Sequence, residues 1–398
     1  MQLLTTSLEN YMLLNKDKVY IINSYTPEKL PWIKENSDTA YIDKQDLTDA
    51  DYWMIRFSDA TSFLIYPLEI LVPGDYLERI RNRDAYLILD NAYEAFFDVI
   101  DSIYSNIVIK YNLPAEQIIV SSGNYDLVSY MKEHALKIKQ SELKIEYFNY
   151  WEWHTYHCYM KQHQKWIDTL EIKEYPKKFL SLNRRWRPHR TAMLSLLFDQ
   201  GIADQGYISF KKAEDNPDWH TAVMIASKYY QNTEIVEVLK RQLEVIRKCF
   251  PLDLDNLILD THNDENMMFT KTMDTFYKNT YFSIVTETTS DKIADGRYIT
   301  EKIFKPIALQ HPFLICGADR TLDALRHLGY KTFKGIIDES YDLETDEAKR
   351  FQMVANEAAR LSNLKDDELK HFLIEAKKIC FENYVTFRNR SQYIWKMN

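Results

Sequence analysis

Short runs of apolar, β-branched and aromatic residues recur along the first part of the chain, and most are separated by polar stretches of helix length. Parallel strands need such long connections, so the pattern predicts an α/β domain built on a parallel sheet. The runs that predict strands are Val19–Asn23, Tyr52–Arg56, Ala85–Asp90, Gln117–Val120 and Lys144–Phe148.

A second α/β pattern follows a lysine-rich segment that ends at Lys178. Phe179–Leu182 predicts a strand, and a polar loop then leads to a helix over Thr191–Phe198. Further along, a short helix with one apolar face begins near Glu301, and Phe313–Cys316 predicts a buried strand. The chain is long enough for two domains that each bury a core.

We place the domain boundary near residue 174. The expected parts are an N-terminal α/β domain over residues 1–173, a C-terminal α/β domain over residues 174–370, and a C-terminal helix over residues 371–398 that packs back on the first domain. The segment after Glu344 predicts mostly helix, because its apolar residues recur at helical spacing.

The helix that begins near Glu301 has the features of an anion-binding site. Thr300 is placed to cap its N-terminus, where unpaired N–H groups and the helix dipole favour an anion. Lys302 and Lys305 lie three residues apart and share a face of the helix. We predict a phosphate pocket formed by Thr300, Glu301, Lys302, Lys305, Gln310, His311 and Pro312. The alternative is a lysine-bearing surface helix ahead of a core strand.

Four arginines occupy the loop between the predicted strand at 179–182 and the helix that follows it. Arginine offers a planar fork of donors that suits phosphate and carboxylate, and this loop leads into a helix N-terminus. A solvated basic loop is the alternative. We predict donor contacts from Ser181, Asn183, Arg184, Arg185 and Arg187.

The segment from Tyr298 to Gly317, together with Glu287, resembles the donor-binding half of GT-B glycosyltransferases, including fucosyltransferase-like enzymes. In that half a glutamate holds a ribose or sugar hydroxyl and a lysine or arginine meets the diphosphate, which implies a donor contact from Glu287. The His311-Pro312 step departs from the fucosyltransferase pattern. It is similar to the His-Pro motif of enzymes that use CMP-activated acidic sugars, and the chain most resembles the retaining β-Kdo transferase module of O-antigen and capsule assembly. The specific resemblance covers roughly residues 179–335.

The resemblance implies a GT-B-like fold, with two Rossmann-like domains facing a central cleft and C-terminal helices that cross back to the first domain. It also implies transfer of a Kdo residue from CMP-Kdo to a saccharide acceptor in lipopolysaccharide O-antigen or capsule biosynthesis. The first domain would then bind the acceptor and the second the donor nucleotide. No metal cofactor is expected, because His311, the lysines and helix ends can stabilise a departing phosphate.

Polar residues follow two predicted strands of the N-terminal half, and ligands of open α/β sheets bind beyond the carboxyl ends of strands. A strand that simply finishes in turn residues explains each position equally well. The segment after residue 147 contains histidines among many aromatic residues, and the aromatic residues suggest packing or a sugar-stacking lid. A metal site there is disfavoured, since no carboxylate or cysteine set completes a ligand spacing. The predicted acceptor contacts are Asp90, Asn91, Ser121, Ser122, Asn124, His154 and His157.

The catalytic carboxylate is the hardest residue to place. Retaining β-Kdo transferases are understood to use an aspartate as covalent nucleophile, and the resemblance puts it near the residues 229–234. Asn232 stands there, and an amide cannot serve as such a nucleophile. Either the placement is wrong or Asn232 is an inactivating replacement of an aspartate. Glu234, Asp218 and Glu152 are the alternatives.

Composition limits the remaining possibilities. The formal charge of −9 and a pI near 5.7 argue against broad binding to nucleic acid. The 4 cysteines are scattered, and the N-terminus does not resemble a signal peptide, which predicts a reduced cytoplasmic protein. No run approaches the roughly 18 apolar residues of a spanning helix. Any association with the inner face of the cytoplasmic membrane is expected to be peripheral, through other domains or partners.

Three functions therefore stay open. A CMP-Kdo transferase accounts for the His-Pro step and the arginine loop. A nucleoside-diphosphate-sugar transferase, fucosyl-like or acting on modified phage DNA, accounts for the Thr300-Glu301-Lys302 helix. A non-catalytic module that binds a glycan or a sugar nucleotide accounts for Asn232.

Overall fold

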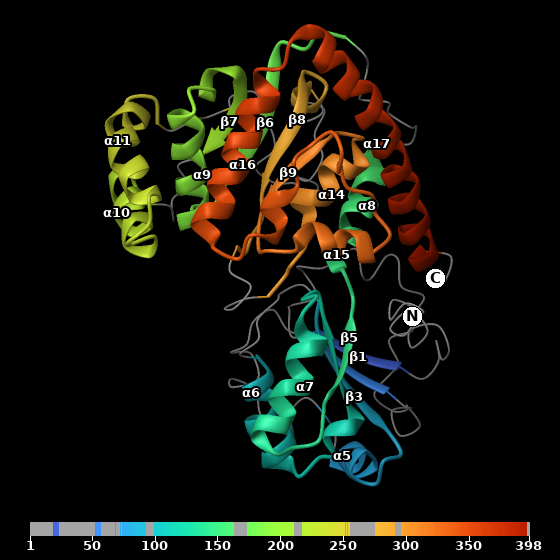
Figure 1. Ribbon diagram of the computed structural model, residues 1–398. Helices are drawn as coiled ribbons and strands as arrows, with labels where there is room; N and C mark the ends of the chain where they lie inside the picture. Colours follow the sequence, from blue (N-terminus) through green and yellow to red (C-terminus); the bar gives the residue numbers. More distant parts are fainter. Residues whose placement is uncertain are drawn as a thin grey trace. The chain divides into compact units, whose positions relative to one another are not determined.

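The computed structural model describes residues 19–23, 52–56, 68, 72, 74–92, 99–162, 173–210, 217–250, 252, 254, 275–290 and 296–395. Within these residues the protein is of the mixed α/β class, with two separate parallel sheets (Figure 1). The chain divides into two compact units. The first unit holds Met1–Trp151, Ile293–Tyr298 and Ser391–Asn398, and the second holds Glu152–Lys292 and Ile299–Arg390.

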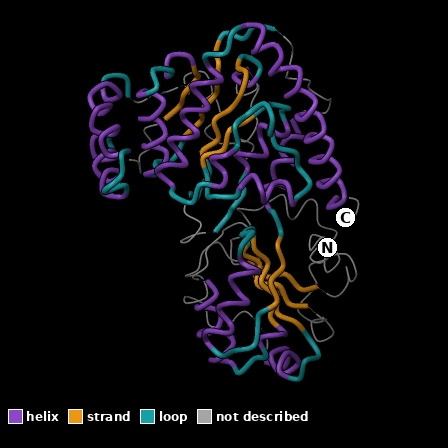
Figure 2. Tube along the Cα trace, in the orientation of Figure 1, coloured by secondary structure: helices purple, strands orange, loops and turns teal. Residues whose placement is uncertain are grey.

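The described strands of the first unit form a parallel sheet in the order β1-β2-β3-β4-β5. The strands of both units are orange in Figure 2. Alternate residues, such as Leu89 on β3 and Val120 on β4, face an apolar core that includes Ile80, Ile100 and Met131 from the helices. All the predicted strands are present close to their predicted bounds. The elements are β1 (Val19–Asn23), β2 (Tyr52–Arg56), α5 (Gly74–Arg81), β3 (Tyr86–Asn91), α6 (Val99–Ile103), β4 (Ile118–Ser122), α7 (Leu127–Ile138) and β5 (Lys144–Tyr147).

The described strands of the second unit form a parallel sheet in the order β7-β6-β8-β9. Helices α9 and α16 pack on each other beside this sheet, α10 and α11 pack on α9, and α14 packs on β8 and β9 (Figure 1). The elements are α8 (Tyr150–Gln162), β6 (Lys177–Asn183), α9 (Pro188–Asp199), β7 (Gly206–Phe210), α10 (Trp219–Tyr229), α11 (Ile235–Arg247), β8 (Thr280–Thr286), α14 (Glu301–Ala308), β9 (Phe313–Cys316), α15 (Thr321–His327), α16 (Glu347–Ser362) and α17 (Asp366–Trp395).

From Glu152 onward helix α8 groups with the second unit, so the two compact units divide after Trp151, whereas the sequence predicts a boundary near residue 174. The reason is aromatic packing between α8 and α17. The ring of Tyr156 lies 5.6 Å from that of Phe387, and the ring of Tyr159 lies 6.1 Å from that of Tyr384. These edge-to-face pairs bury large apolar area on both helices.

Helix α17 contributes residues to both units. The sequence predicts that residues 371–398 pack on the first domain; in the structure the part up to Arg390 groups with the second unit, and Ser391–Asn398 group with the first. The α8 contacts account for this grouping, because they fix the buried face of α17. None of the described helices combines the length and apolar character needed to cross a bilayer.

Candidate functional site

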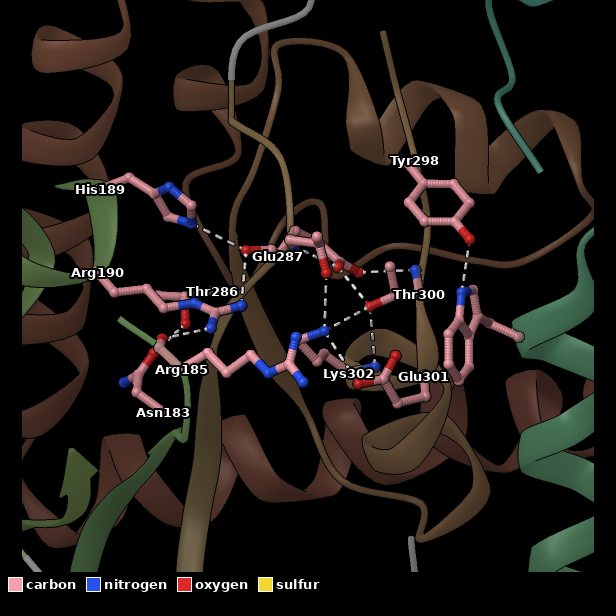
Figure 3. A network of polar contacts seen from close by, with 12 residues as sticks. Asn183, Arg185, His189, Arg190, Thr286, Glu287, Tyr298, Thr300, Glu301 and Lys302 are labelled. Atoms are coloured by element: carbon pink, nitrogen blue, oxygen red, sulfur yellow. Dashed lines mark hydrogen bonds and ion pairs between the residues drawn. The ribbon is translucent and has the colours of Figure 1, made fainter. Parts of the chain in front are cut away.

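Three segments of the second unit meet at the carboxyl edge of its sheet. Strand β6 ends at Asn183 and β8 ends at Thr286, and because the two strands are parallel, both ends lie on one edge. Helix α14 brings its N-terminus to the same place. Thr300 caps this helix by accepting a hydrogen bond from Lys302 N, which confirms the predicted cap. Figure 3 shows the polar network that results.

Glu287 is the centre of this network. Its buried carboxylate accepts hydrogen bonds from Thr300 N at 3.0 Å, from Thr300 Oγ1 at 2.6 Å and from Thr288 N at 3.1 Å. Its backbone carbonyl accepts from His189 Nε2 at 2.9 Å and from Arg190 Nη2 at 3.2 Å. Burial raises the pKa of Glu287, although Lys302 and the Thr300 donors oppose this. Glu287 thus ties the end of β8 to the beginnings of α9 and α14.

Lys302 of α14 stands next to this carboxylate, and both Lys302 and Lys305 act on the carboxylate of Glu301. The ammonium group of Lys302 donates to Thr288 Oγ1 at 2.9 Å, Thr300 Oγ1 at 3.1 Å and Glu301 Oε1 at 2.9 Å. Burial alone would raise the pKa of Glu301, but the charges of Lys302 and Lys305 outweigh it and hold that pKa at about 2. Glu301 is therefore a carboxylate at neutral pH.

The arginine loop lies between β6 and α9. Arg184, Arg185 and Arg187 are exposed, whereas Arg190 is buried and donates to the backbone oxygen of Arg185 at 2.7 Å. Arg187 precedes α9, and its side chain does not cap the helix. In Figure 3 the Arg185 side chain points toward Lys302. The exposed guanidinium groups of this loop therefore stand beside the N-terminus of α9, where the helix dipole favours an anion.

Two buried groups support this loop. Burial, with the charge of Arg190, lowers the pKa of His189 to about 3, so its imidazole is neutral. A carbonyl can only accept, hence His189 Nε2 carries the proton donated to Glu287 O. Burial and the charge of Arg187 lower the pKa of Arg190 to about 10, which leaves its guanidinium charged at neutral pH.

Ser181 and Asn183 serve as scaffold in this structure. Both are buried. Asn183 Nδ2 donates to Ser181 Oγ at 3.3 Å, Asn183 N donates to Ser209 Oγ at 3.2 Å, and the Thr286 hydroxyl donates to Asn183 Oδ1. These bonds fasten the carboxyl ends of β6, β7 and β8 to one another and fix the base of the arginine loop.

His311 does not belong to the group of cations that the sequence led us to expect. It follows the C-terminus of α14 and precedes β9, so it lies at the amino edge of the sheet, the length of α14 away from Thr300. The ring is 1% exposed. Its Nε2 lies 3.0 Å from Thr280 O and its Nδ1 lies 2.9 Å from Ser283 Oγ. The imidazole therefore joins the α14–β9 corner to β8.

Gln310 and Pro312, on either side of His311, also have structural roles. Gln310 is buried and adopts a left-handed conformation, with φ of 52°. The carbonyl of Pro312 accepts from Ser283 N at 2.8 Å. The predicted phosphate pocket is thus divided in the structure, with Thr300, Glu301, Lys302 and Lys305 at the carboxyl edge and residues 310–312 at the other.

The catalytic candidates on the α10–α11 hairpin are exposed. Asn232 has φ of 69°, a left-handed conformation that asparagine tolerates better than most residues, so the turn itself accounts for the amide. Asp218 caps α10 by accepting from Thr221 N at 3.0 Å, and Glu234 precedes α11. Among the described residues, no hydrogen bond links Asn232, Glu234 or Asp218 to the Glu287 network.

Glu152 is held in a buried ion pair. Its carboxylate accepts from Arg390 Nε at 2.6 Å, from Arg390 Nη2 at 3.1 Å and from the Tyr330 hydroxyl at 2.6 Å. The first residue of the second unit is in this way fastened to Arg390, where α17 leaves that unit. These contacts give Glu152 a structural role.

The predicted acceptor residues lie where β3 and β4 end, in the first unit. Ser122 Oγ accepts from Asn124 N at 3.1 Å, and Asn124 Oδ1 accepts from Asp126 N at 2.9 Å, so both shape the turn before α7. Ser121 Oγ is buried without a hydrogen-bond partner among the described residues. Asp90 accepts from Ala92 N at 3.3 Å, and Asn91 is buried.

The histidines of α8 do not complete a described cluster. His154 Nε2 lies 3.7 Å from Cys158 Sγ, and the side chain of His157 falls outside the described residues. In the part of the chain that the structure describes, no group of three or more His, Cys, Asp or Glu residues is arranged to hold a metal ion.

Sequence reasoning missed two groups that shape the site. Arg350 on α16 is buried and donates to Gly317 O at 3.0 Å, Ser290 O at 2.8 Å and Glu344 O at 2.7 Å. It anchors the loops that follow β8 and β9, yet it looks like any arginine of an amphipathic helix. The paired donors from His189 and Arg190 to Glu287 O were missed because they depend on two loops meeting in space.

Comparisons with known proteins identify no family. No protein-family model matches the chain, and no curated protein matches it in sequence. A solved structure of an alpha,alpha-trehalose-phosphate synthase (UDP-forming) from Burkholderia vietnamiensis is similar over 94% of this chain and 75% of that chain, with 13% identity and a TM-score of 0.45. Similarity at this level determines neither family nor function, and the α/β class rests on the two parallel sheets themselves.

Proposed function

We propose that the chain is a glycosyltransferase of the GT-B type that binds a nucleotide-activated sugar at the carboxyl edge of the second sheet. The observation that carries this proposal is the convergence of cations there. Arg184, Arg185 and Arg187 come from the β6–α9 loop, and Lys305 comes from α14. The N-termini of both helices point to the same edge, which favours a phosphate ligand.

The chemistry follows from this charge. Glycosyl transfer leaves negative charge on the departing phosphate, and preorganised cations and helix N-termini stabilise that charge in the transition state. The protein holds these groups in place before a ligand arrives, because Arg190 and the Glu287 carboxylate fasten the two loops. A donor phosphate next to Arg185 and Lys305 would leave with its charge neutralised.

As the specific donor we propose CMP-Kdo, with a saccharide as acceptor. Kdo carries a carboxylate in addition to the phosphate of CMP, and several cations in one place suit a ligand with two anionic groups. The His-Pro step gives this choice less support than its sequence implies, because the ring of His311 is in the core. The choice of CMP-Kdo is supported by the arginine loop and by the resemblance to β-Kdo transferases.

A nucleoside-diphosphate-sugar transferase is the second candidate. It is favoured by the linkage of Glu287, Thr300 and Lys302, because these residues carry the resemblance to fucosyltransferase-like enzymes and are bonded to one another. A diphosphate also supplies two negative charges. The nucleotide that binds distinguishes the two candidates.

The test is a melting curve with CMP, GDP, UDP and ADP, followed by an assay for release of CMP from CMP-Kdo with a saccharide acceptor. At a hundredfold excess over the dissociation constant, a ligand stabilises the folded state by about 2.7 kcal/mol. Selective stabilisation by CMP together with CMP release supports the proposal. Preference for GDP or UDP favours the second candidate. Nucleotide binding without turnover of any donor indicates a binding module.

A further inference from the structure

The two lysines of α14 differ in how the protein uses them. An ammonium group has three N–H donors. Lys302 directs its donors to Thr288 Oγ1, Thr300 Oγ1 and Glu301 Oε1, at 2.9, 3.1 and 2.9 Å. Its hydrogen-bonding capacity is used within the protein, and a ligand anion could bind Lys302 only by displacing one of these partners.

Lys305 is in the opposite state. It is partly buried, and its ammonium group has no hydrogen-bond or ion-pair partner among the described residues. The nearby carboxylate, Glu301, is bonded to Lys302. Burial, with the like charges of Lys302 and Arg184, lowers the pKa of Lys305 against the opposing effect of Glu301. Both lysines act on the Glu301 carboxylate, which forms its ion pair with Lys302.

An ammonium group that is partly desolvated and unpaired destabilises the folded protein. Proteins retain such a group where function needs it, and residues of functional sites commonly make the protein less stable than a substitution at the same position would. The Glu287 network explains the position of Lys302 without any ligand. Lys305 receives no such explanation from the described residues.

We propose that Lys305, rather than Lys302, is the lysine of α14 that binds an oxyanion of the donor, with Arg184 beside it. This inference rests on the proposed function and extends it by naming the group that meets the ligand. The oxyanion is the sugar carboxylate or the phosphate. Lys302 then acts as a positioning residue that holds Thr300 and Glu301.

The test compares Lys305→Met with Lys302→Met on the same helix, and with Lys240→Met, which removes an exposed lysine paired to Glu237 on α11. Calorimetry measures the affinity for CMP and for CMP-N-acetylneuraminic acid, a CMP-sugar whose carboxylate is attached to the anomeric carbon as in CMP-Kdo. Melting temperatures are measured without ligand.

Lys305→Met is expected to weaken donor binding by about tenfold, the effect of one charge-assisted contact. If the substitution lowers the affinity for the CMP-sugar and not for CMP, the anion that Lys305 binds is the carboxylate. If it lowers the affinity for both ligands, the anion is the phosphate. Without ligand, Lys305→Met is expected to melt at or slightly above the wild-type temperature, because it removes an unpaired cation. Lys302→Met is expected to melt lower, since it leaves three oxygens without their donor. Lys240→Met changes neither measurement.

Two results would overturn the inference. One is wild-type affinity of Lys305→Met for both ligands. The other is a melting temperature of Lys305→Met as low as that of Lys302→Met, which would mean that Lys305 has a partner in the protein. If the wild type binds neither ligand, the proposed function is wrong, and the role of Lys305 is tested separately with inorganic phosphate. The inference then requires that phosphate raises the melting temperature of the wild type and does not raise that of Lys305→Met.

Discussion

His311 provides a sharp test of the structure, because the sequence assigns it to phosphate binding and the structure assigns it to the core. We consider the change His311→Ala. The ring is buried, accepts from the Ser283 hydroxyl and donates to Thr280 O. Its removal leaves a cavity and an unpaired carbonyl. Substitutions of this kind destabilise by about 3 kcal/mol at neutral pH.

The loss is expected to depend on pH. Burial lowers the pKa of His311 from 6.5 to about 4. Between these values the unfolded chain binds a proton that the folded protein does not bind, so the neutral ring stabilises the fold above pH 6.5 and this contribution is lost as the pH falls toward 4. At pH 5 the wild type has lost about 2 kcal/mol from this source. The effect of His311→Ala therefore shrinks from about 3 kcal/mol at pH 7 to about 1 kcal/mol at pH 5.

Urea unfolding followed by circular dichroism at pH 7 and pH 5 measures both values. The control is His220→Ala, which changes an exposed histidine on α10 and is expected to alter stability by less than about 0.5 kcal/mol. Nucleotide affinity of folded His311→Ala is expected to equal that of the wild type. Unchanged stability together with lost nucleotide binding would refute the core assignment, and so would a destabilisation of equal size at both pH values.

Two predictions concern the first unit. A Cβ added at Gly123 would lie 2.7 Å from the backbone oxygen of Ala92, so Gly123→Ala is expected to lower the unfolding free energy by about 1–3 kcal/mol. A urea titration measures this loss. The control is Gly74→Ala, because nothing lies within 4 Å of a Cβ added there. Asp126→Asn leaves the largely enclosed guanidinium of Arg297 without the carboxylate that it pairs with, and the expected loss is about 3 kcal/mol. Hydrogen exchange of α7 amides measures that loss, and wild-type exchange rates would contradict it.

Local pattern sufficed for much of the architecture. The strands β1, β2 and β9 have the bounds that their apolar runs predict, and α14 begins after the Thr300 cap as expected. Each of these features depends on neighbours in sequence, such as an apolar period, a capping hydroxyl or a proline. The arginine loop was found for the same reason, since it immediately follows β6.

The errors concern relations between distant segments. The spacing of the 298–317 segment places Lys302 and His311 close in sequence, but α14 separates them by its own length. The aromatic residues of α8 gave no sign that their partners lie on α17, more than two hundred residues later. Asn232 has φ of 69°, a left-handed conformation that asparagine tolerates and that its position in the sequence does not reveal.

The location of the donor site is the central claim, and hydrogen exchange with and without CMP tests it most directly. We predict slower exchange in residues 184–191 and 299–305, with unchanged exchange in the α10–α11 hairpin. Protection at the carboxyl ends of β3 and β4 alone, or no protection anywhere at a CMP concentration that shifts the melting temperature, would contradict the account.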